Sequence, residues 1–264
     1  MRLRRATVGV LCLGLLEGCS TLPHERQWGA DVTAAPGWHR IGTAAAAAAR
    51  DPLVWGPVLG AAALQVGHWD RDASDWAREQ TPVFGSTRDA DRWSDDLRDA
   101  TRYAHVATVL ASSSGHTPSA WTLNKLRGVL VDLGAIGATR AVTGGLKGAS
   151  NRERPNALDH RSFPSGHAST AVVHASLASR NLEFVPLRPW VRDGFDAGLQ
   201  LADFGTAWAR VEAGMHYPSD VLAGVALGRF LGALFHDALL DPARPREGWV
   251  VTVHPLFVTA GGVQ

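Results

Sequence analysis

The 264-residue chain is patterned as a succession of helices, and the clearest of them begins at Thr117-Pro118. A threonine N-cap followed by proline at the first helical position is a strong start signal, because the hydroxyl satisfies a free amide and the proline needs no hydrogen bond there. Apolar side chains then recur at spacings of three and four, at Leu123, Leu126, Leu130, Leu133 and Ile136. This spacing predicts one long helix with an apolar face.

Similar signals predict helices along most of the chain. Ser86 predicts the cap of a helix with one solvated face and an apolar face at Trp93, Leu97, Ala104 and Ala107. Further helices are expected at Ser165–Arg180, Pro189–Val211 and Pro218–Leu240. Pro52–Trp69 predicts a buried or membrane-grazing helix, short for a span. No strand series or repeat is evident, so the sequence predicts an all-α bundle, with a short strand or hairpin within Trp249–Thr259.

Residues 1–19 have the parts of an export signal: three arginines, an apolar stretch from Val8 to Leu16, and small residues. The end of this segment, Leu16-Glu17-Gly18-Cys19, resembles the lipobox of bacterial lipoproteins, in which the cysteine is acylated; an ordinary signal peptide cut nearby is the alternative. The serine after Cys19 resembles lipoproteins sent to the outer membrane. We therefore expect a periplasm-facing, lipid-anchored protein with a linker over 20–40, a helical domain over 41–240 and a tail over 241–264.

Two segments in the second half carry groups suited to an anion. The first segment runs from Lys147, at the end of a predicted helix, to Arg154-Pro155 in the following loop. Cations are also common at helix C-termini because they interact favourably with the helix dipole. In Phe163-Pro-Ser-Gly-His167, Ser165 is a natural N-cap, and the amides of Gly166 and His167 stand at the positive end of the helix dipole. A phosphate would bind well there. Taken alone, a plain capped helix with a surface histidine is an equal alternative.

A third segment contains Arg210, His216 and Asp220. Because Pro218 is expected to start a helix, Asp220 would lie about one turn beyond His216 and could accept one ring N–H while leaving the other nitrogen bare. That arrangement orients a nucleophile or base, as in a triad. A purely structural His–Asp pair is the alternative for this segment alone.

Together, Lys-x6-Arg-Pro, Pro-Ser-Gly-His and Arg-x5-His-x3-Asp resemble the signature of the type 2 phosphatidic acid phosphatase superfamily, which also contains bacterial acid phosphatases and vanadium haloperoxidases. The resemblance covers residues 147–228 and implies a helical core whose loops converge at one end. One departure is Ala209, where the family often has serine before the arginine. The departure removes one hydroxyl contact but no charge and no catalytic group.

The resemblance implies a metal-independent phosphatase without cofactor. Lys147, Arg154 and Arg210 would hold the phosphoryl oxygens, with hydrogen bonds from Ser165 and Gly166. His216, held by Asp220, would attack phosphorus and form a phosphohistidine. His167 would protonate the leaving oxygen and later activate water. The expected substrate is a phosphomonoester or diphosphate, most readily of a membrane lipid.

Other assignments stay open beside this one. A phosphomonoesterase for soluble periplasmic substrates, a vanadate-dependent haloperoxidase and a non-catalytic envelope lipoprotein are the alternatives. The 26 Lys and Arg balance 25 Asp and Glu, so no nucleic-acid partner is indicated, and no protein partner is inferred. His68, Asp70 and Asp72 form a metal-like cluster but are predicted to be a solvated helix face. His174, seven residues after His167, is predicted to be a core histidine rather than a site residue.

Overall fold

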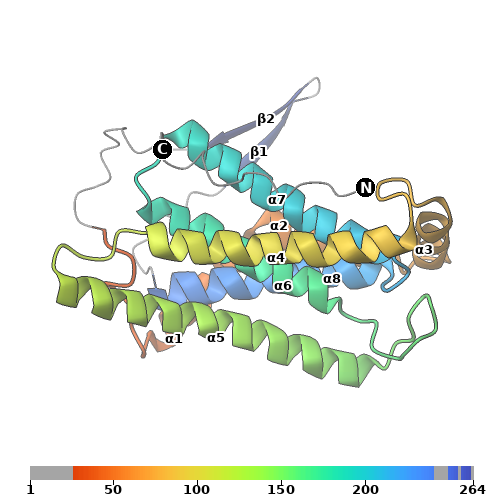
Figure 1. The fold of residues 1–264 in the computed structure, drawn as a ribbon, viewed down its shortest axis with the longest axis horizontal. Helices are drawn as coiled ribbons and strands as arrows, with labels where there is room; N and C mark the ends of the chain where they lie inside the picture. Colours follow the sequence, from red (N-terminus) through yellow and green to blue (C-terminus); the bar gives the residue numbers. More distant parts are fainter. Residues whose placement is uncertain (1–25, 241–248, 255–256, 263–264) are drawn as a thin grey trace, which may run out of the picture.

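The computed structural model describes residues 26–240, 249–254 and 257–262, so the predicted signal and Cys19 lie outside the described residues. The predicted all-α bundle is confirmed (Figure 1). Its helices are α1 (Gly37–Arg50), α2 (Pro52–Ala63), α3 (Trp69–Gln80), α4 (Thr87–Ala111), α5 (Pro118–Ser150), α6 (Gly166–Asn181), α7 (Pro189–Glu212) and α8 (Pro218–Phe235), the last extended by a π-helical turn, η2 (His236–Leu240). The expected C-terminal hairpin is formed by antiparallel β1 (Trp249–His254) and β2 (Phe257–Gly262).

The polar residues that the sequence marks as helix starts cap the helices in the structure. Ser86 Oγ accepts a hydrogen bond from the Asp89 amide at 3.0 Å, and Thr117 Oγ1 accepts one from the Ala120 amide at 3.2 Å. Ser165 Oγ accepts from the Ala168 amide at 3.4 Å. Each cap satisfies an amide that has no partner within its own helix, which explains why these predicted starts are placed to within a residue.

Two N-terminal expectations differ from the structure. The segment Pro52–Trp69 is not one helix, because α2 ends at Ala63 and α3 begins at Trp69 after a turn. The expected linker contains a fully buried tryptophan, Trp28, whose Nε1 donates to Asn181 Oδ1 at 2.7 Å. This side chain packs against Gly128 of α5, where an added Cβ would lie 2.4 Å from the indole ring. Residues 26–36 therefore belong to the packed structure, and α1 begins at Gly37.

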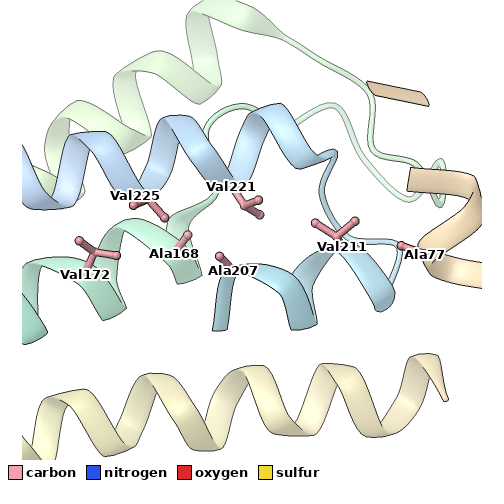
Figure 2. Close-up of a cluster of buried hydrophobic side chains, with 7 residues drawn as sticks. All are labelled: Ala77, Ala168, Val172, Ala207, Val211, Val221 and Val225. Atoms are coloured by element: carbon pink, nitrogen blue, oxygen red, sulfur yellow. The ribbon is translucent and has the colours of Figure 1, made fainter. Parts of the chain in front are cut away.

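The core beside the motif segments is built from small side chains. Figure 2 shows alanines and valines of α6, α7 and α8 meeting one another, with Ala77 of α3 closing the cluster near the end of the bundle; its members are Ala77, Ala168, Val172, Ala207, Val211, Val221 and Val225. Small side chains let helix backbones approach closely. Small side chains at these positions thereby allow α6, α7 and α8 to pack closely against one another.

Helices α6 and α8 approach each other closely along a stripe of glycines four residues apart. A Cβ added at Gly224 would lie 2.6 Å from Ser165 O, and one added at Gly228 would lie 2.5 Å from Ser169 O. One added at Gly232 would lie 2.9 Å from Ser176 Oγ. Real Cβ atoms do not come so near backbone oxygens, so the backbone of α8 lies directly on the backbone of the α6 segment at Gly224 and Gly228, and against the Ser176 side chain at Gly232.

Helix α5 is formed as predicted, but its leucine face points away from the bundle. Leu123, Leu126, Leu130 and Leu133 are all about half exposed. The buried face is instead polar in large part and includes Asn124, Lys125, Asp132, Thr139 and Thr143. Helix α4 also differs from expectation: it buries Ser94, Thr101, His105 and Thr108, while Trp93 is half exposed. By length and composition, Pro118–Ser150 and Pro218–Leu240 could each cross a membrane.

Candidate active site

The three motif segments come together at one end of the bundle, where α5 and α7 end and α6 and α8 begin (Figure 1). Arg154 Nη1 lies 3.3 Å from His216 Nε2, and Lys147 Cε lies 3.8 Å from where a Cβ of Gly166 would stand. The charges of Lys147 and Arg210 both act on His216, and that of Arg210 also acts on His167. All eight described residues of the predicted site are therefore at this end: Lys147, Arg154, Ser165, Gly166, His167, Arg210, His216 and Asp220.

His216 is buried, with only 1% of its surface exposed. Its Nε2 faces the Arg154 guanidinium, which can only donate, so Nε2 presents its lone pair. Burial, reinforced by the nearby Arg210 and Lys147 cations, lowers the pKa of His216 to about 4. At neutral pH this ring is uncharged, and its Nε2 is the nitrogen available to an electrophile.

Asp220 lies beside the other nitrogen of that ring but at a longer distance than the sequence predicts. His216 Nδ1 is 3.8 Å from Asp220 Oδ2, beyond hydrogen-bond range, and is without a hydrogen-bond partner among the described residues. Asp220 Oδ2 instead accepts from Ser162 Oγ at 2.5 Å and from the Tyr217 amide at 2.9 Å. The carboxylate is therefore fixed in place and orients the ring by charge rather than by contact.

Arg210 is buried in the last turn of α7 and reaches across to α4. Its Nη1 donates to Asp91 Oδ1 at 2.5 Å and to Ser94 Oγ at 3.1 Å. Its Nε is buried without a hydrogen-bond partner among the described residues. A buried, unsatisfied N–H of a cation is costly, and it suits an anion that binds between Arg210 and its neighbours.

His167 also has a partner on α4. Its Nε2 lies 3.0 Å from Asp95 Oδ1, and Arg98 Nη1 pairs with the same carboxylate at 2.9 Å. Burial, followed by the charge of Arg210, lowers the pKa of His167 to about 4, whereas Asp95 acts in the opposite direction. A histidine that releases a proton readily is suited to acid catalysis once an anion beside it supports the protonated form.

The loop of residues 151–165 holds the remaining cations in place. Lys147 Nζ donates to Arg161 O. Arg154 Nε donates to Asp159 Oδ1 at 2.7 Å, and its Nη1 donates to Met215 O at 2.9 Å. Ser165 is fully buried, and its amide donates to Asp220 O at 2.9 Å. That last bond ties the start of α6 directly to the start of α8.

Sequence reasoning placed Asp70 on a solvated helix face, and this is wrong. Asp70 is buried, and it accepts hydrogen bonds from the Ser219 amide at 2.8 Å and from Arg152 Nη2 at 2.6 Å. Arg152 Nη1 in turn donates to Asp220 Oδ1 at 2.7 Å. The carboxylate therefore helps to fix Asp220 through Arg152, while His68 and Asp72 remain exposed.

Several residues that shape the site carried no motif in the sequence. Asp91, Ser94 and Asp95 lie on one face of α4, at spacings of three and four, which is the only signal that could have grouped them. Arg152 lies between the two cations of the first motif, at a position that the motif leaves unspecified. His174, by contrast, is a core residue as predicted: its Nδ1 lies 3.1 Å from His105 Nδ1, and His105 Nε2 lies 2.8 Å from Asp132 Oδ2.

Comparison with known proteins agrees with this arrangement. Residues 128–241 match the family model described as the PAP2 superfamily. This segment of the chain is a PAP2 superfamily region. Over 98 residues, or 36% of the chain, it is 37% identical to a lipid A 1-phosphatase from Porphyromonas gingivalis. Over 133 residues, or 42% of the chain, it is 32% identical to a probable lipid phosphate phosphatase beta from Arabidopsis thaliana. These matches span 21% and 61% of the two relatives.

The PAP2 fold is also found in a solved structure. The crystal structure of a transmembrane PAP2-type phosphatidylglycerolphosphate phosphatase from Bacillus subtilis superposes with a TM-score of 0.53 at 21% identity, covering 70% of this chain and 93% of that one. This likeness establishes the fold. The PAP2 match begins at residue 128, so α1 to α4 lie outside it, including the α4 residues that contact Arg210 and His167.

Proposed function

We propose that this PAP2 protein is a metal-independent phosphatase that removes a phosphate from a membrane lipid. The observation that carries the proposal is the gathering of three cations, Lys147, Arg154 and Arg210, around two histidines at the end of one helical bundle. Fixed cations in a partly dry site stabilise the charge that develops on a transferring phosphoryl group. The unsatisfied Nε of Arg210 supports the same role.

In the first step, His216 Nε2 attacks phosphorus while the bond from phosphorus to the ester oxygen breaks. The Nε2 lone pair is available because burial keeps the ring neutral. His167 gives its proton to the departing oxygen, so the alcohol leaves uncharged. Asp220 stabilises the positive charge that His216 gains on forming the phosphohistidine.

In the second step, neutral His167 takes a proton from water, and the water oxygen attacks phosphorus. The bond from phosphorus to His216 Nε2 breaks, which releases inorganic phosphate and restores the free histidine. Each histidine ends the cycle in its starting state.

A lipid substrate is supported by the outer surface of the bundle. Its half-exposed apolar side chains follow α5 from Trp121 to Leu146, about 38 Å at 1.5 Å per residue, which exceeds the hydrocarbon thickness of a bilayer. In water such a face would be a large uncompensated apolar patch. We therefore propose that the outer face of α5 contacts the membrane. The names of the two relatives, a lipid A phosphatase and a lipid phosphate phosphatase, support the same substrate class.

Soluble phosphomonoesters are the second candidate substrates, because the site itself has no feature that requires a lipid tail. Purified protein should be compared on p-nitrophenyl phosphate, phosphatidate and an isoprenoid diphosphate. Faster hydrolysis of the two lipids is expected. Hydrolysis of p-nitrophenyl phosphate alone would favour the soluble substrates.

Activity is expected to persist in EDTA and to be inhibited by vanadate, which adopts the five-coordinate geometry of the transferring group. Arg210→Ala or Arg154→Ala should lose on the order of 3 kcal/mol of transition-state stabilisation, by analogy with removing one preorganised donor. Arg127→Ala, on α5 and outside the site, is the matched control. Complete loss of activity in EDTA, restored by a divalent ion, would count against the proposal.

Cys19→Ser is expected to leave the protein in the membrane fraction after an alkaline carbonate wash. We propose that residues 1–19 direct export and that Cys19 carries a lipid anchor, but the outward leucines of α5 should hold the bundle without it. Cys12→Ser is the control, and immunoblotting of pellet and supernatant is the measurement. Quantitative release of the Cys19→Ser protein would show that the anchor alone retains it.

A further inference from the structure

We propose that Asp95 of α4 is a positioning residue that holds the proton-donor histidine of this enzyme in one tautomer and supports its protonated form. This inference rests on the proposed function, because it assigns the residue through which His167 is controlled. It concerns a segment that precedes the matched PAP2 region and that belongs to none of the three sequence motifs.

The geometry fixes which ring nitrogen does what. His167 Nε2 lies 3.0 Å from Asp95 Oδ1, and an ionised carboxylate can only accept, so Nε2 carries a hydrogen. When the ring is neutral, its single proton is therefore on Nε2, and Nδ1 has the lone pair. Nδ1 is thus the atom that gives a proton to the ester oxygen and later takes one from water, while the Nε2 hydrogen stays with Asp95.

The carboxylate itself is held by a neighbour on the same helix. Arg98 Nη1 pairs with Asp95 Oδ1 at 2.9 Å, and Arg98 Nε reaches Asp99 Oδ1 at 3.3 Å. The side chain of Arg98 is only 17% exposed, so this arm is packed against the bundle. Arg98 therefore supports Asp95, whose own side chain is 51% exposed, at one turn of α4.

The charges around His167 explain why such support is needed. Arg98 of α4 and Arg210 of α7 both disfavour a positive ring, and Lys147 of α5 lies beside the adjacent Gly166. Asp95 is the carboxylate that acts against them. A bound phosphate adds negative charge on the other side of the ring, so the protonated ring is stabilised by Asp95 at Nε2 and by the substrate at Nδ1 until the ester bond breaks.

Asp91 and Asp95, which lie on the same face of α4, have separable roles. Asp91 contacts Arg210, which holds the phosphoryl group, whereas Asp95 contacts His167, which protonates the leaving oxygen. Loss of Asp91 should weaken binding and slow all substrates alike. Loss of Asp95 should matter most for esters whose leaving group needs a proton.

The test compares phenyl phosphate with p-nitrophenyl phosphate, whose leaving group departs more readily, on purified full-length protein. Asp95→Asn should lower kcat on phenyl phosphate by about tenfold to a hundredfold and on p-nitrophenyl phosphate by less than about threefold, a part of the roughly 10²- to 10⁴-fold that general acid catalysis supplies. The high-pH limb of kcat should move to lower pH, because removing the carboxylate makes the protonated ring easier to deprotonate. Asp96→Asn, which removes an exposed carboxylate of the same helix, is the matched control and should leave both rates unchanged.

A double variant separates this role from a structural one. Asp95→Asn added to His167→Ala should cause no further loss on phenyl phosphate, since Asp95 acts only through His167. If wild type hydrolyses neither ester nor the lipid substrates, the proposed function fails. If wild type is active but Asp95→Asn slows both esters equally, or the double variant loses additional activity, the role of Asp95 is overturned.

Discussion

His216→Ala is expected to lose activity on every phosphate ester, by at least about 10⁴-fold, because the nucleophile is absent and the remaining groups cannot form the covalent intermediate. His167→Ala should lose most activity on alkyl phosphates yet keep more on p-nitrophenyl phosphate, whose leaving group needs little protonation. The two variants are thus expected to differ in which substrates they still hydrolyse, and not only in how fast they hydrolyse them.

Rapid quenching with labelled substrate under alkaline conditions, which preserve phosphohistidine, is the decisive measurement. Label should be found on His167→Ala protein and not on His216→Ala protein. His116→Ala, an exposed histidine beside the start of α5, is the control and should behave as wild type. Label retained by the His216→Ala protein would reverse the two roles.

Gly228→Ala is expected to destabilise the bundle by about 3 kcal/mol and to abolish activity, although it adds a single methyl group. The new Cβ would lie 2.5 Å from Ser169 O and 3.1 Å from Val173 N, and backbone atoms cannot move aside as a flexible side chain can. Overpacking of this kind costs about 1–3 kcal/mol even against side chains. Thermal unfolding in detergent micelles measures the effect.

The matched control variant is expected to change the folding stability in the opposite direction. A Cβ at Gly137 of α5 meets nothing within 4 Å, and alanine is favoured over glycine inside a helix by up to about 1 kcal/mol. Gly137→Ala should therefore raise stability slightly. Equal stability of the two variants would mean that α6 and α8 can separate without cost.

The site was predictable where one segment contains both the chemical group and the local structure that aims it. Ser165, Gly166 and His167 are an example, because a cap and a helix start are read from adjacent residues. Asp95 and Asp91 could not be assigned in this way. Their partners are far away in sequence, and on a helix rich in Asp and Arg a half-exposed carboxylate that contacts another helix cannot be told from one that contacts only water.

The orientation of α5 shows a different limit. A spacing of three and four reports that leucines share a face, but it does not report whether that face packs inside the bundle or lies on its surface. The opposite face answers the question in the structure, since it buries Lys125 and Asp132 among other helices. Asp70 was misassigned for a related reason: charged neighbours suggested water, whereas the fold brings Arg152 and Ser219 to it.

The glycine contacts between α6 and α8 separate the reaction geometry from the choice of substrate. His167 begins one of these helices and His216 immediately precedes the other, and Ser165 N–H to Asp220 O joins their first turns. The span between His167 and His216 is therefore set by main chain against main chain, not by side chains that line a binding surface. Exposed side chains on α2, α3 and the outer face of α5 can be exchanged without altering that span, so on the proposed function this scaffold is suited to redesign of substrate specificity by surface substitution alone.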